Sequence, residues 1–302
     1  MFRYLQQLAI ITPYAEFKFT FTSLSTPSRC VSFHYERRSD NMPDESLEIA
    51  HHPSSVNNLL VQQLIDNTRQ RTLLGFLTTD FSGVKKAVAL RVIKELGMGT
   101  GTLGDEDFHE KMNPREIDPK QINRLCQILT SVKEFAAPDG KCLSPAGEYN
   151  MRLGIDKMYE PDMLFTASES PSAYDGHPFV IEAAVAFGGK CREKLNVTRF
   201  ANRIPLLFEA GGDVACKVVN KGIDWKSYNV DKEANRVEVF VSIVSTKVPF
   251  KGTGKEYIGD DIEPIKASIK KAIQNCCRQL KEVLGKRKHL ADIKTRRVKI
   301  LK

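Results

Sequence analysis

The spacing of apolar residues changes twice along this chain, and this limits how the chain can fold. Near the N-terminus, Phe17, Phe19 and Phe21 alternate with polar residues, as in a β-strand with one apolar face. From residue 54 to residue 155, apolar residues recur every three or four positions, as in amphipathic helices. Beyond residue 160, short apolar runs alternate with helical patterns. A chain of 302 residues with three such regions predicts two or three domains of mixed α and β structure.

The middle region carries clear helix boundaries. Asp118 is followed by Pro119 and Gln121, which predicts a capping box with proline in the first helical position. Ser82 is predicted to cap an earlier helix that closes at Gly97. These signals predict a region made of several short helices.

The last region reads as strands joined by helices and ends in a long helix. Apolar runs predict strands at residues 179–187, 203–208 and 237–243. The apolar positions of the final helix are spaced by three and four residues: Ile262, Ile265, Ile269, Ile273, Cys276, Leu280 and Leu284. This order predicts a sheet backed by helices.

The positive charge gathers at the C-terminus. The formal net charge is +8, and residues 281–302 hold nine lysines and arginines against Glu282 and Asp292. An acidic partner is expected at that end, either nucleic acid or an acidic protein surface, and the alternatives are a solvated tail or a nuclear import signal at Lys286–Lys288. No apolar run reaches the length of about 18 residues that a membrane helix needs.

The familiar catalytic motifs are missing. The chain has no G-x-S-x-G, H-E-x-x-H or Walker A pattern. The G-x-G-x-x-G pattern at 99–104 follows a helix and precedes an acidic stretch, so it is interpreted as a loop. Seven cysteines without a C-x-x-C pair predict neither a disulfide framework nor a metal site, and His51-His52 is interpreted as part of a linker.

Two short segments could carry binding chemistry. Lys247 follows a predicted strand, and its compact ammonium suits a terminal phosphate, although an ordinary surface lysine is the plainer interpretation. Trp225-Lys226-Ser227-Tyr228 combines aromatic and basic side chains, which suits nucleic acid, although a core anchor is the plainer interpretation of Trp225.

Several blocks, taken in order along nearly the whole chain, resemble the B subunits of DNA topoisomerase VI, the ATP-gated type IIB topoisomerase, in its plant-type branch. The blocks are ITPYA (11–15), RRSDNMP (37–43), HP (52–53), RTLL (71–74) with FL (76–77), CLSP (142–145), GHPFV (176–180), FGG (187–189), RFANRIPLL (199–207) and STKVPF (245–250).

This resemblance implies an α+β chain of four parts. Residues 1–50 would be a C-terminal remnant of a GHKL-type ATPase sheet, and 51–155 a helix-two-turn-helix-like domain. Residues 156–285 would be a transducer domain, a sheet backed by helices like the second domain of ribosomal protein S5, with a long C-terminal helix. Residues 286–302 would be a basic tail that extends the stalk.

The resemblance also implies roles for particular residues. Lys247 matches the lysine that senses the γ-phosphate of ATP held by the neighbouring ATPase domain. The residues implied in DNA contact are Trp225, Lys226, Tyr228, Lys286, Arg287, Lys288, Arg296 and Arg297. No metal ligand is implied in this chain, because the helix with the magnesium-binding Asn and catalytic Glu, the D-x-G-x-G loop and the glycine-rich lid have no match.

The function implied is that of the B subunit in an ATP-dependent type II topoisomerase, coupling ATP binding and hydrolysis to DNA cleavage and strand passage by the A subunit. The partners would be double-stranded DNA, the topoisomerase VI A subunit, and a second copy of the B subunit in an A2B2 assembly in the nucleus, without a membrane. ATP and Mg²⁺ are expected in the full-length protein, and this chain alone is expected to hold neither tightly and to be inactive. The missing motifs leave open a truncated gene product or a real short form. The alternative function is a non-catalytic B-like scaffold that binds DNA and an A-type subunit without ATP gating.

Overall fold

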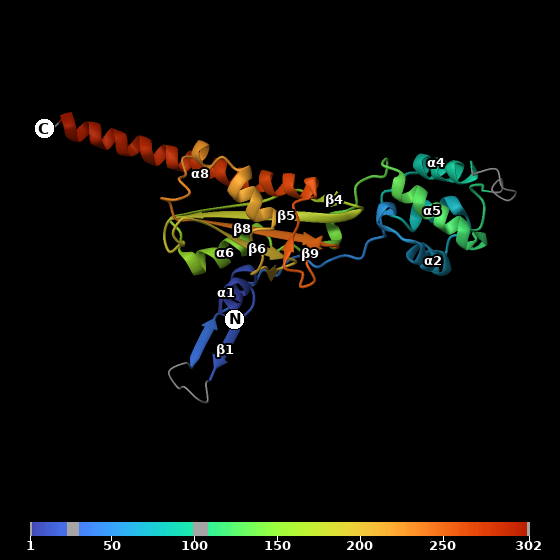
Figure 1. Ribbon diagram of the computed structural model, residues 1–302, viewed down its shortest axis with the longest axis horizontal. Helices are drawn as coiled ribbons and strands as arrows, with labels where there is room; N and C mark the ends of the chain where they lie inside the picture. The colour runs from blue at the N-terminus through green and yellow to red at the C-terminus, as the bar shows by residue number, and fades with distance from the viewer. Residues whose placement is uncertain (1, 23–29, 99–107, 301–302) are drawn as a thin grey trace. The chain divides into compact units, whose positions relative to one another are not determined.

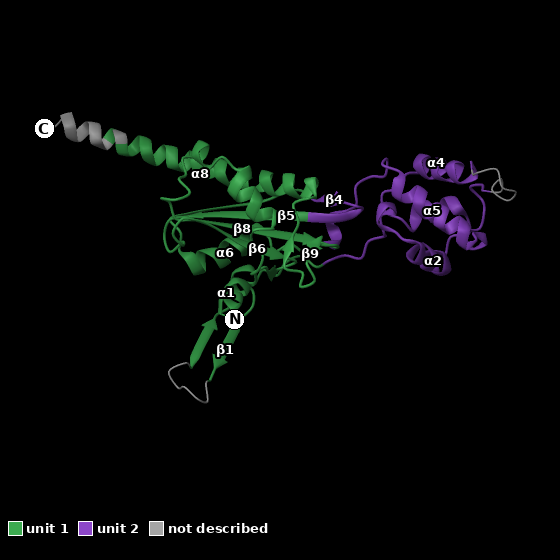
Figure 2. Cartoon of the chain, in the orientation of Figure 1, with its two compact units in different colours: residues 1–45, 144–170, 180–302 green, residues 46–143, 171–179 purple. Residues whose placement is uncertain are grey.

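The computed structural model describes residues 2–22, 30–98 and 108–300, which form two compact units (Figure 2). Unit 1 comprises residues 1–45, 144–170 and 180–302, and unit 2 comprises residues 46–143 and 171–179. The helix α6 (Glu148–Tyr159), which straddles the end of the predicted helical domain, belongs to unit 1. The division into four domains stays a prediction.

A mixed sheet forms the centre of unit 1, with strands in the order β3-β5-β8-β6-β7 (Figure 1). These strands are β3 (Met163–Ser168), β5 (His177–Phe187), β6 (Leu195–Ala201), β7 (Ile204–Pro205) and β8 (Val237–Ser245). The first three residues of β5 belong to unit 2, where they pair with the short strand β4 (Ser172–Tyr174). β6 and β8 are parallel, whereas β3 is antiparallel to β5 and β7 is antiparallel to β6.

Two of the three predicted strands in this region are confirmed as β5 and β8. The predicted strand at 203–208 is wrong over most of its length, because the longer strand there is β6, which ends at Ala201 and turns back as the two-residue β7. Polar residues such as Asn196 and Thr198 weaken the apolar pattern by which a strand is predicted from the sequence. The segment nevertheless forms a strand, because it pairs with β8.

Helices cover both faces of the sheet. Figure 1 shows the sheet between α8 (Glu263–Ile300) and α6. Ala184 of β5 belongs to a buried cluster with Met151 of α6, whereas the thiol of Cys276 on α8 donates to the carbonyl oxygen of Ala183 at 3.6 Å. Neighbouring residues of a strand point to opposite faces, so β5 is buried on both. The predicted long final helix is confirmed.

A buried carboxylate of the sheet, that of Glu238, is paired with an arginine. Every residue of β8 is buried, and Glu238 is fully buried there. The guanidinium of Arg192 donates both Nε and Nη2 to the Glu238 carboxylate, and the hydroxyl of Thr198 donates to it at 3.0 Å. A buried carboxylate needs such donors to offset its lost hydration.

The N-terminal segment packs on α6. α1 (Phe2–Ile11) approaches α6 so closely that a Cβ at Gly154 would overlap the carbonyl oxygen of Ile10. β1 (Phe17–Phe21) and β2 (Val31–Tyr35) form an antiparallel hairpin, and the ring of Phe2 meets Phe33 edge-on at 4.9 Å. Ile10 and Ile11 enter the core cluster of unit 1, which joins this segment to the sheet.

Unit 2 is a cluster of short helices. They are η2 (Pro53–Ser55), α2 (Asn58–Asn67), α3 (Leu73–Thr79), α4 (Lys86–Gly97), η4 (Pro114–Glu116), α5 (Pro119–Ser131) and η5 (Gly140–Cys142). The predicted capping box is confirmed, with Asp118 and Gln121 each accepting from the other's backbone N–H. The predicted cap at Ser82 is wrong, because α4 begins after Lys85 without a side-chain cap.

Three further observations concern the sequence motifs. The G-x-G-x-x-G pattern lies outside the described residues. All seven cysteines are free thiols. Within the described ranges no helix is long and apolar enough to cross a membrane, and no group of three or more His, Cys, Asp or Glu residues could hold a metal ion.

His52 predicts a pH-dependent stability of unit 2. Its Nδ1 accepts from the backbone N–H of Ser54 at 3.2 Å, so Nε2 carries the proton that is donated to the Ala136 carbonyl at 3.0 Å. Burial lowers the pKa of His52 below its ordinary value of 6.5, although the bond to Ala136 opposes this shift. The folded state therefore favours the neutral ring. The stability this provides is present above pH 6.5 and is lost as the pH falls through the lower folded pKa.

We expect unit 2 to unfold at a temperature several degrees lower at about pH 5 than at about pH 7.5. Hydrogen exchange of the α5 amides against temperature measures this. His52→Asn keeps an acceptor for the Ser54 N–H and cannot titrate, so its pH dependence should be flatter. Equal pH dependence in the two proteins would rule out His52 as the source.

Candidate functional site

The candidate site is the loop that leaves β8. The strand ends at Ser245, and the next two residues, Thr246 and Lys247, are exposed. The Ser245 hydroxyl accepts from the backbone N–H of Lys247 and donates to its carbonyl, both at 3.2 Å. Within the described residues the Lys247 ammonium makes no hydrogen bond or ion pair. It is therefore a cation held on an ordered loop and available to an anion.

The turn between β6 and β7 is hydrogen-bonded to the end of β8. The Asn202 side chain donates to the carbonyl of Ser245 at 3.1 Å and accepts from its N–H at 2.9 Å. The Asn202 N–H donates to the Ile243 carbonyl at 2.8 Å. These three bonds satisfy backbone groups that β8 leaves unpaired where it ends. They fix the point from which the Lys247 loop departs.

The same turn contacts the N-terminal segment. The guanidinium Nη1 of Arg203 donates to the Tyr14 hydroxyl at 3.1 Å, and both side chains are half-buried. Tyr14 follows α1 and precedes β1. The Lys247 loop and the N-terminal segment thus meet at one two-residue turn.

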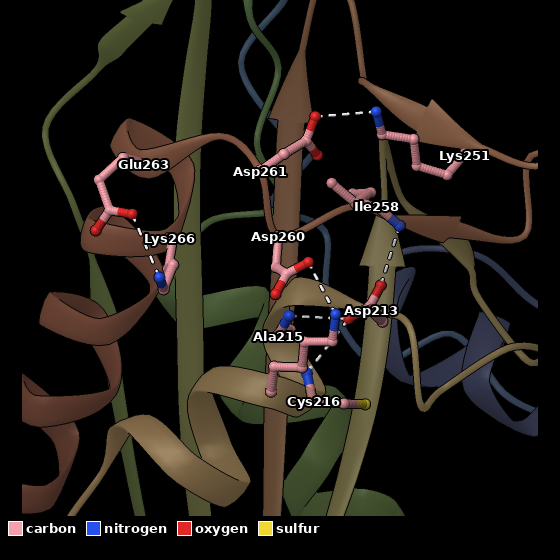
Figure 3. A network of polar contacts seen from close by, with 10 residues as sticks. Asp213, Ala215, Cys216, Lys251, Ile258, Asp260, Asp261, Glu263 and Lys266 are labelled. Carbon is pink, nitrogen blue, oxygen red and sulfur yellow. Dashed lines mark hydrogen bonds and ion pairs between the residues drawn. The ribbon is translucent and has the colours of Figure 1, made fainter.

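The carboxylate of Asp213 is the centre of a polar network in the same unit (Figure 3). One of its carboxylate oxygens accepts from the N–H groups of Ala215 and Cys216 at 2.9 and 3.3 Å, and the other accepts from Ile258 at 3.2 Å. Its charge is balanced by Arg199, whose Nη1 lies 3.1 Å from Oδ2, with only 4% and 2% of the two side chains exposed.

The pair holds β6, α7 (Val214–Lys217) and β10 (Tyr257–Ile258) together. Arg199 also donates to the carbonyls of Leu206 and Phe208 at 3.1 and 2.8 Å. Around it, an exposed pair joins Lys217 to Asp260 at 2.8 Å. A second exposed pair joins Lys251 to Asp261 at 2.9 Å (Figure 3). These contacts join β6, α7 and β10 to the segment around Lys251, which follows the Lys247 loop.

The residues predicted to contact DNA lie in two separate segments of the chain. Trp225 is a core side chain, 1% exposed, and its indole N–H donates to the Val219 carbonyl at 2.7 Å. A buried indole cannot stack on a base, so the predicted DNA contact in this segment would fall to the exposed Lys226 and the half-exposed Tyr228 of η7 (Trp225–Tyr228), and it stays a prediction.

The predicted basic tail continues α8. Lys286, Arg287 and Lys288 are exposed on this helix, and Lys286 pairs with Glu282 at 2.6 Å. The backbone of Arg296 and Arg297 is part of α8, and their side chains lie outside the described part of the structure.

One cluster was missed by sequence reasoning. Arg69, Arg71 and Arg115 line a cavity of about 520 Å³ in unit 2, together with Thr68, Gln70 and Asn113. Arg115 donates to the carbonyls of Asp66 and Thr68 at 3.4 and 3.3 Å. In the part of the chain that the structure describes, the exposed side chains of Arg69 and Arg71 make no hydrogen bond or ion pair. Their separation along the chain from Arg115 hid the cluster, and only the adjacent Arg-Gln-Arg run signalled it.

Fold and site together define a mixed α/β protein whose helix-backed sheet presents an exposed lysine at a strand end and leads into a long C-terminal helix. Residues 138–296, more than half of the chain, match the family model described as the transducer of the topoisomerase VI B subunit. The chain belongs to the topoisomerase VI B-subunit family.

Relatives from plants and archaea are named as B subunits of the same enzyme. The DNA topoisomerase 6 B subunit of Arabidopsis thaliana is 48% identical over 285 residues, covering 94% of this chain and 41% of the relative. The protein of that name from Oryza sativa subsp. indica is 45% identical, covering 94% of this chain and 40% of the relative. The type 2 DNA topoisomerase 6 B subunit of Saccharolobus islandicus (strain L.S.2.15) is 32% identical, covering 100% of this chain and 54% of the relative.

The chain spans between two fifths and just over half of the length of these relatives. Among solved structures, the B-subunit of the DNA gyrase from Myxococcus xanthus matches with a TM-score of 0.30 at 16% identity, covering 45% of this chain and 40% of that chain. A likeness this low bears on neither fold nor function.

Proposed function

We propose that this chain works as the transducer-bearing part of the B subunit in a topoisomerase VI, coupling ATP binding and hydrolysis to DNA cleavage and strand passage by the A subunit. Membership of the family supports the B-subunit role. The observation that carries the coupling role is the Lys247 ammonium, exposed and without a partner in the described residues, on a loop anchored by Ser245.

The chemistry of this ammonium fits a terminal phosphate. A lysine ammonium is a compact point charge with three donors, which suits a phosphate oxygen. ATP with Mg²⁺, held by the ATPase part of a B subunit, would supply a γ-phosphate charge that is present before hydrolysis and released afterwards. Lys247 would contact that charge, and the Asn202 bonds at the base of its loop would pass the resulting pull to β6 and β8.

The expected partners follow from this role. We propose that this chain joins double-stranded DNA, the A subunit, and a second copy of the B subunit in the nucleus as an A2B2 complex. The exposed cations on α8 and Lys226 are candidate phosphate contacts. The arginine cavity of unit 2 adds a second candidate, because guanidinium groups without carboxylate partners attract phosphate oxygens.

A chimeric B subunit tests the coupling role. In it this chain replaces the matched segment of the Arabidopsis relative, and the product is assembled with the Arabidopsis A subunit. We expect relaxation of supercoiled DNA that requires ATP. Assembly with DNA and the A subunit without ATP-dependent relaxation would instead favour a scaffold without ATP gating, and would count against the proposal.

The arginine cavity predicts a measurable DNA contribution. Each arginine that contacts a phosphate adds about 0.9 to the slope of log affinity against log salt. Arg69→Ala/Arg71→Ala in the full chain should weaken duplex binding about tenfold at ~0.1 M salt and make the slope shallower by about 2. A fluorescence anisotropy titration at several salt concentrations measures both quantities. Lys120→Ala/Lys133→Ala, which removes two exposed cations of unit 2 outside the cavity, is the control, and equal losses in the two variants would discount the cavity.

A further inference from the structure

The β6–β7 turn joins two parts of unit 1 that are far apart in the chain. Tyr14 and Arg203 are separated by 189 residues and meet at 3.1 Å. Asn202 and Ser245 are separated by 43 residues and share two side-chain bonds. Ser245 then holds the backbone of Lys247 at both its N–H and its carbonyl. Hydrogen bonds on either side of the covalently joined Asn202 and Arg203 therefore link the N-terminal segment to the lysine loop.

The backbone of the turn is unusual. Asn202 and Arg203 both have positive φ, 47° and 65°. Asparagine tolerates this left-handed conformation, and glycine is the residue that usually follows it in a two-residue hairpin turn. Arginine at the second position carries a backbone cost that glycine would avoid. The hydrogen bond from its guanidinium to the Tyr14 hydroxyl gives a reason why arginine, and not glycine, stands at this position.

We propose that the Asn202–Arg203 turn is a positioning element, which sets the place of Lys247 relative to the N-terminal segment and transmits movement of that segment through the Tyr14–Arg203 bond. This inference rests on the proposed phosphate contact of Lys247. Asn202 and Arg203 act through the lysine loop and touch no ligand themselves. A shift of Tyr14 would pull the turn, and the two Asn202 bonds would carry the pull to Ser245.

The first test reads the loop directly in the full chain. Asn202→Gly removes both side-chain bonds and keeps a residue that adopts positive φ without strain. We expect the Ser245 and Lys247 amides to exchange hydrogen about tenfold faster, with the Val239 and Val241 amides unchanged. Asn202→Asp keeps the acceptor for the Ser245 N–H and should restore part of the protection. Asn229→Gly, at an exposed asparagine with φ of 63°, is the matched control. Unchanged exchange in Asn202→Gly overturns the proposal.

The second test separates positioning from general damage. In the chimeric protein, Asn202→Gly should lower the rate of ATP-dependent relaxation about tenfold, Tyr14→Phe several-fold, and Lys247→Ala more than either. If the turn acts through the lysine, Asn202→Gly causes no further loss in a Lys247→Ala background. A loss that multiplies the Lys247→Ala loss overturns the positioning role, because a purely structural defect acts in either background.

The outcomes also distinguish the positioning role of the turn from the phosphate contact of Lys247 on which it rests. Relaxation unaffected by Lys247→Ala refutes the proposed phosphate contact, and the positioning role falls with it. Relaxation that responds to Lys247→Ala but not to Asn202→Gly or Tyr14→Phe leaves the phosphate contact in place and refutes the positioning role alone.

Discussion

Replacing Lys247 with alanine in the chimeric protein should lower its ATP-dependent DNA relaxation about a hundredfold. The ammonium is exposed and has no partner in the described residues. It projects from a loop whose base is held by the Ser245 hydroxyl. Losing one well-placed donor to a reacting or switching anion typically has an effect of this size. A gel assay of supercoiled plasmid at saturating ATP measures the rate.

Two further variants sharpen this result. Lys247→Arg keeps the positive charge but changes its shape and reach, so we expect a loss of intermediate size. Lys221→Ala removes another exposed lysine of unit 1 and should leave relaxation unchanged. Relaxation by Lys247→Ala at the parental rate would refute the phosphate contact, provided that the chimera itself requires ATP.

Replacing Asp213 with alanine should destabilise unit 1 by about 3–5 kcal/mol, the usual loss when one partner of a buried ion pair is removed. Arg199 would keep its charge in a place where only 4% of its side chain is exposed. The N–H groups of Ala215, Cys216 and Ile258 would lose their shared acceptor (Figure 3). Urea unfolding followed by Trp225 fluorescence reports on unit 1, because this buried residue is the chain's one tryptophan.

The neighbouring exposed pair provides the control. Lys217 and Asp260 lie 2.8 Å apart with 36% and 45% of their side chains exposed. Solvent screens such a pair, so Asp260→Ala should destabilise unit 1 far less than Asp213→Ala does. Replacing Arg199 and Asp213 together with leucine should cost less than Asp213→Ala alone, because no buried charge is left unpaired. Equal losses for Asp213→Ala and Asp260→Ala would show that burial does not set the effect.

Local signals in the sequence predicted several elements well. The helix that starts after Asp118 has its cap, proline and Gln121 within four consecutive residues, so the prediction needed no tertiary information. The final helix was equally clear, because its apolar stripe becomes the buried face, including Ile265, Ile269 and Ile273.

Other elements were predicted wrongly because contacts with residues far away in the sequence determine whether the segment forms a strand. The strand β6 contains Asn196, Thr198 and Arg199, which weaken its apolar pattern. The bond of Thr198 to Glu238 and the ion pair of Arg199 with Asp213 let these two polar residues fit a sheet interior. The apolar run at 203–208 looked more like a strand, but only Ile204 and Pro205 pair.

The candidate site shows the same division. Lys247 was found from its place after a strand and from the family block around it. Its supports, Asn202 and Tyr14, carried no signal of their own, and neither did the meeting of Arg115 with Arg69 and Arg71. The residues around Trp225 favour a core role for it, and its burial agrees with that interpretation.

The amino-acid order alone therefore determined the start of α5, the apolar stripe of the final helix and the family of this chain, since each depends on residues a few positions apart or on contiguous blocks. Only the tertiary structure decided which polar side chains meet: Asn202 with Ser245, Arg203 with Tyr14, and Arg199 with Asp213. The reason is physical. Periodicity records which face of an element is buried, but a hydrogen bond between segments depends on where the whole sheet brings two strand ends together.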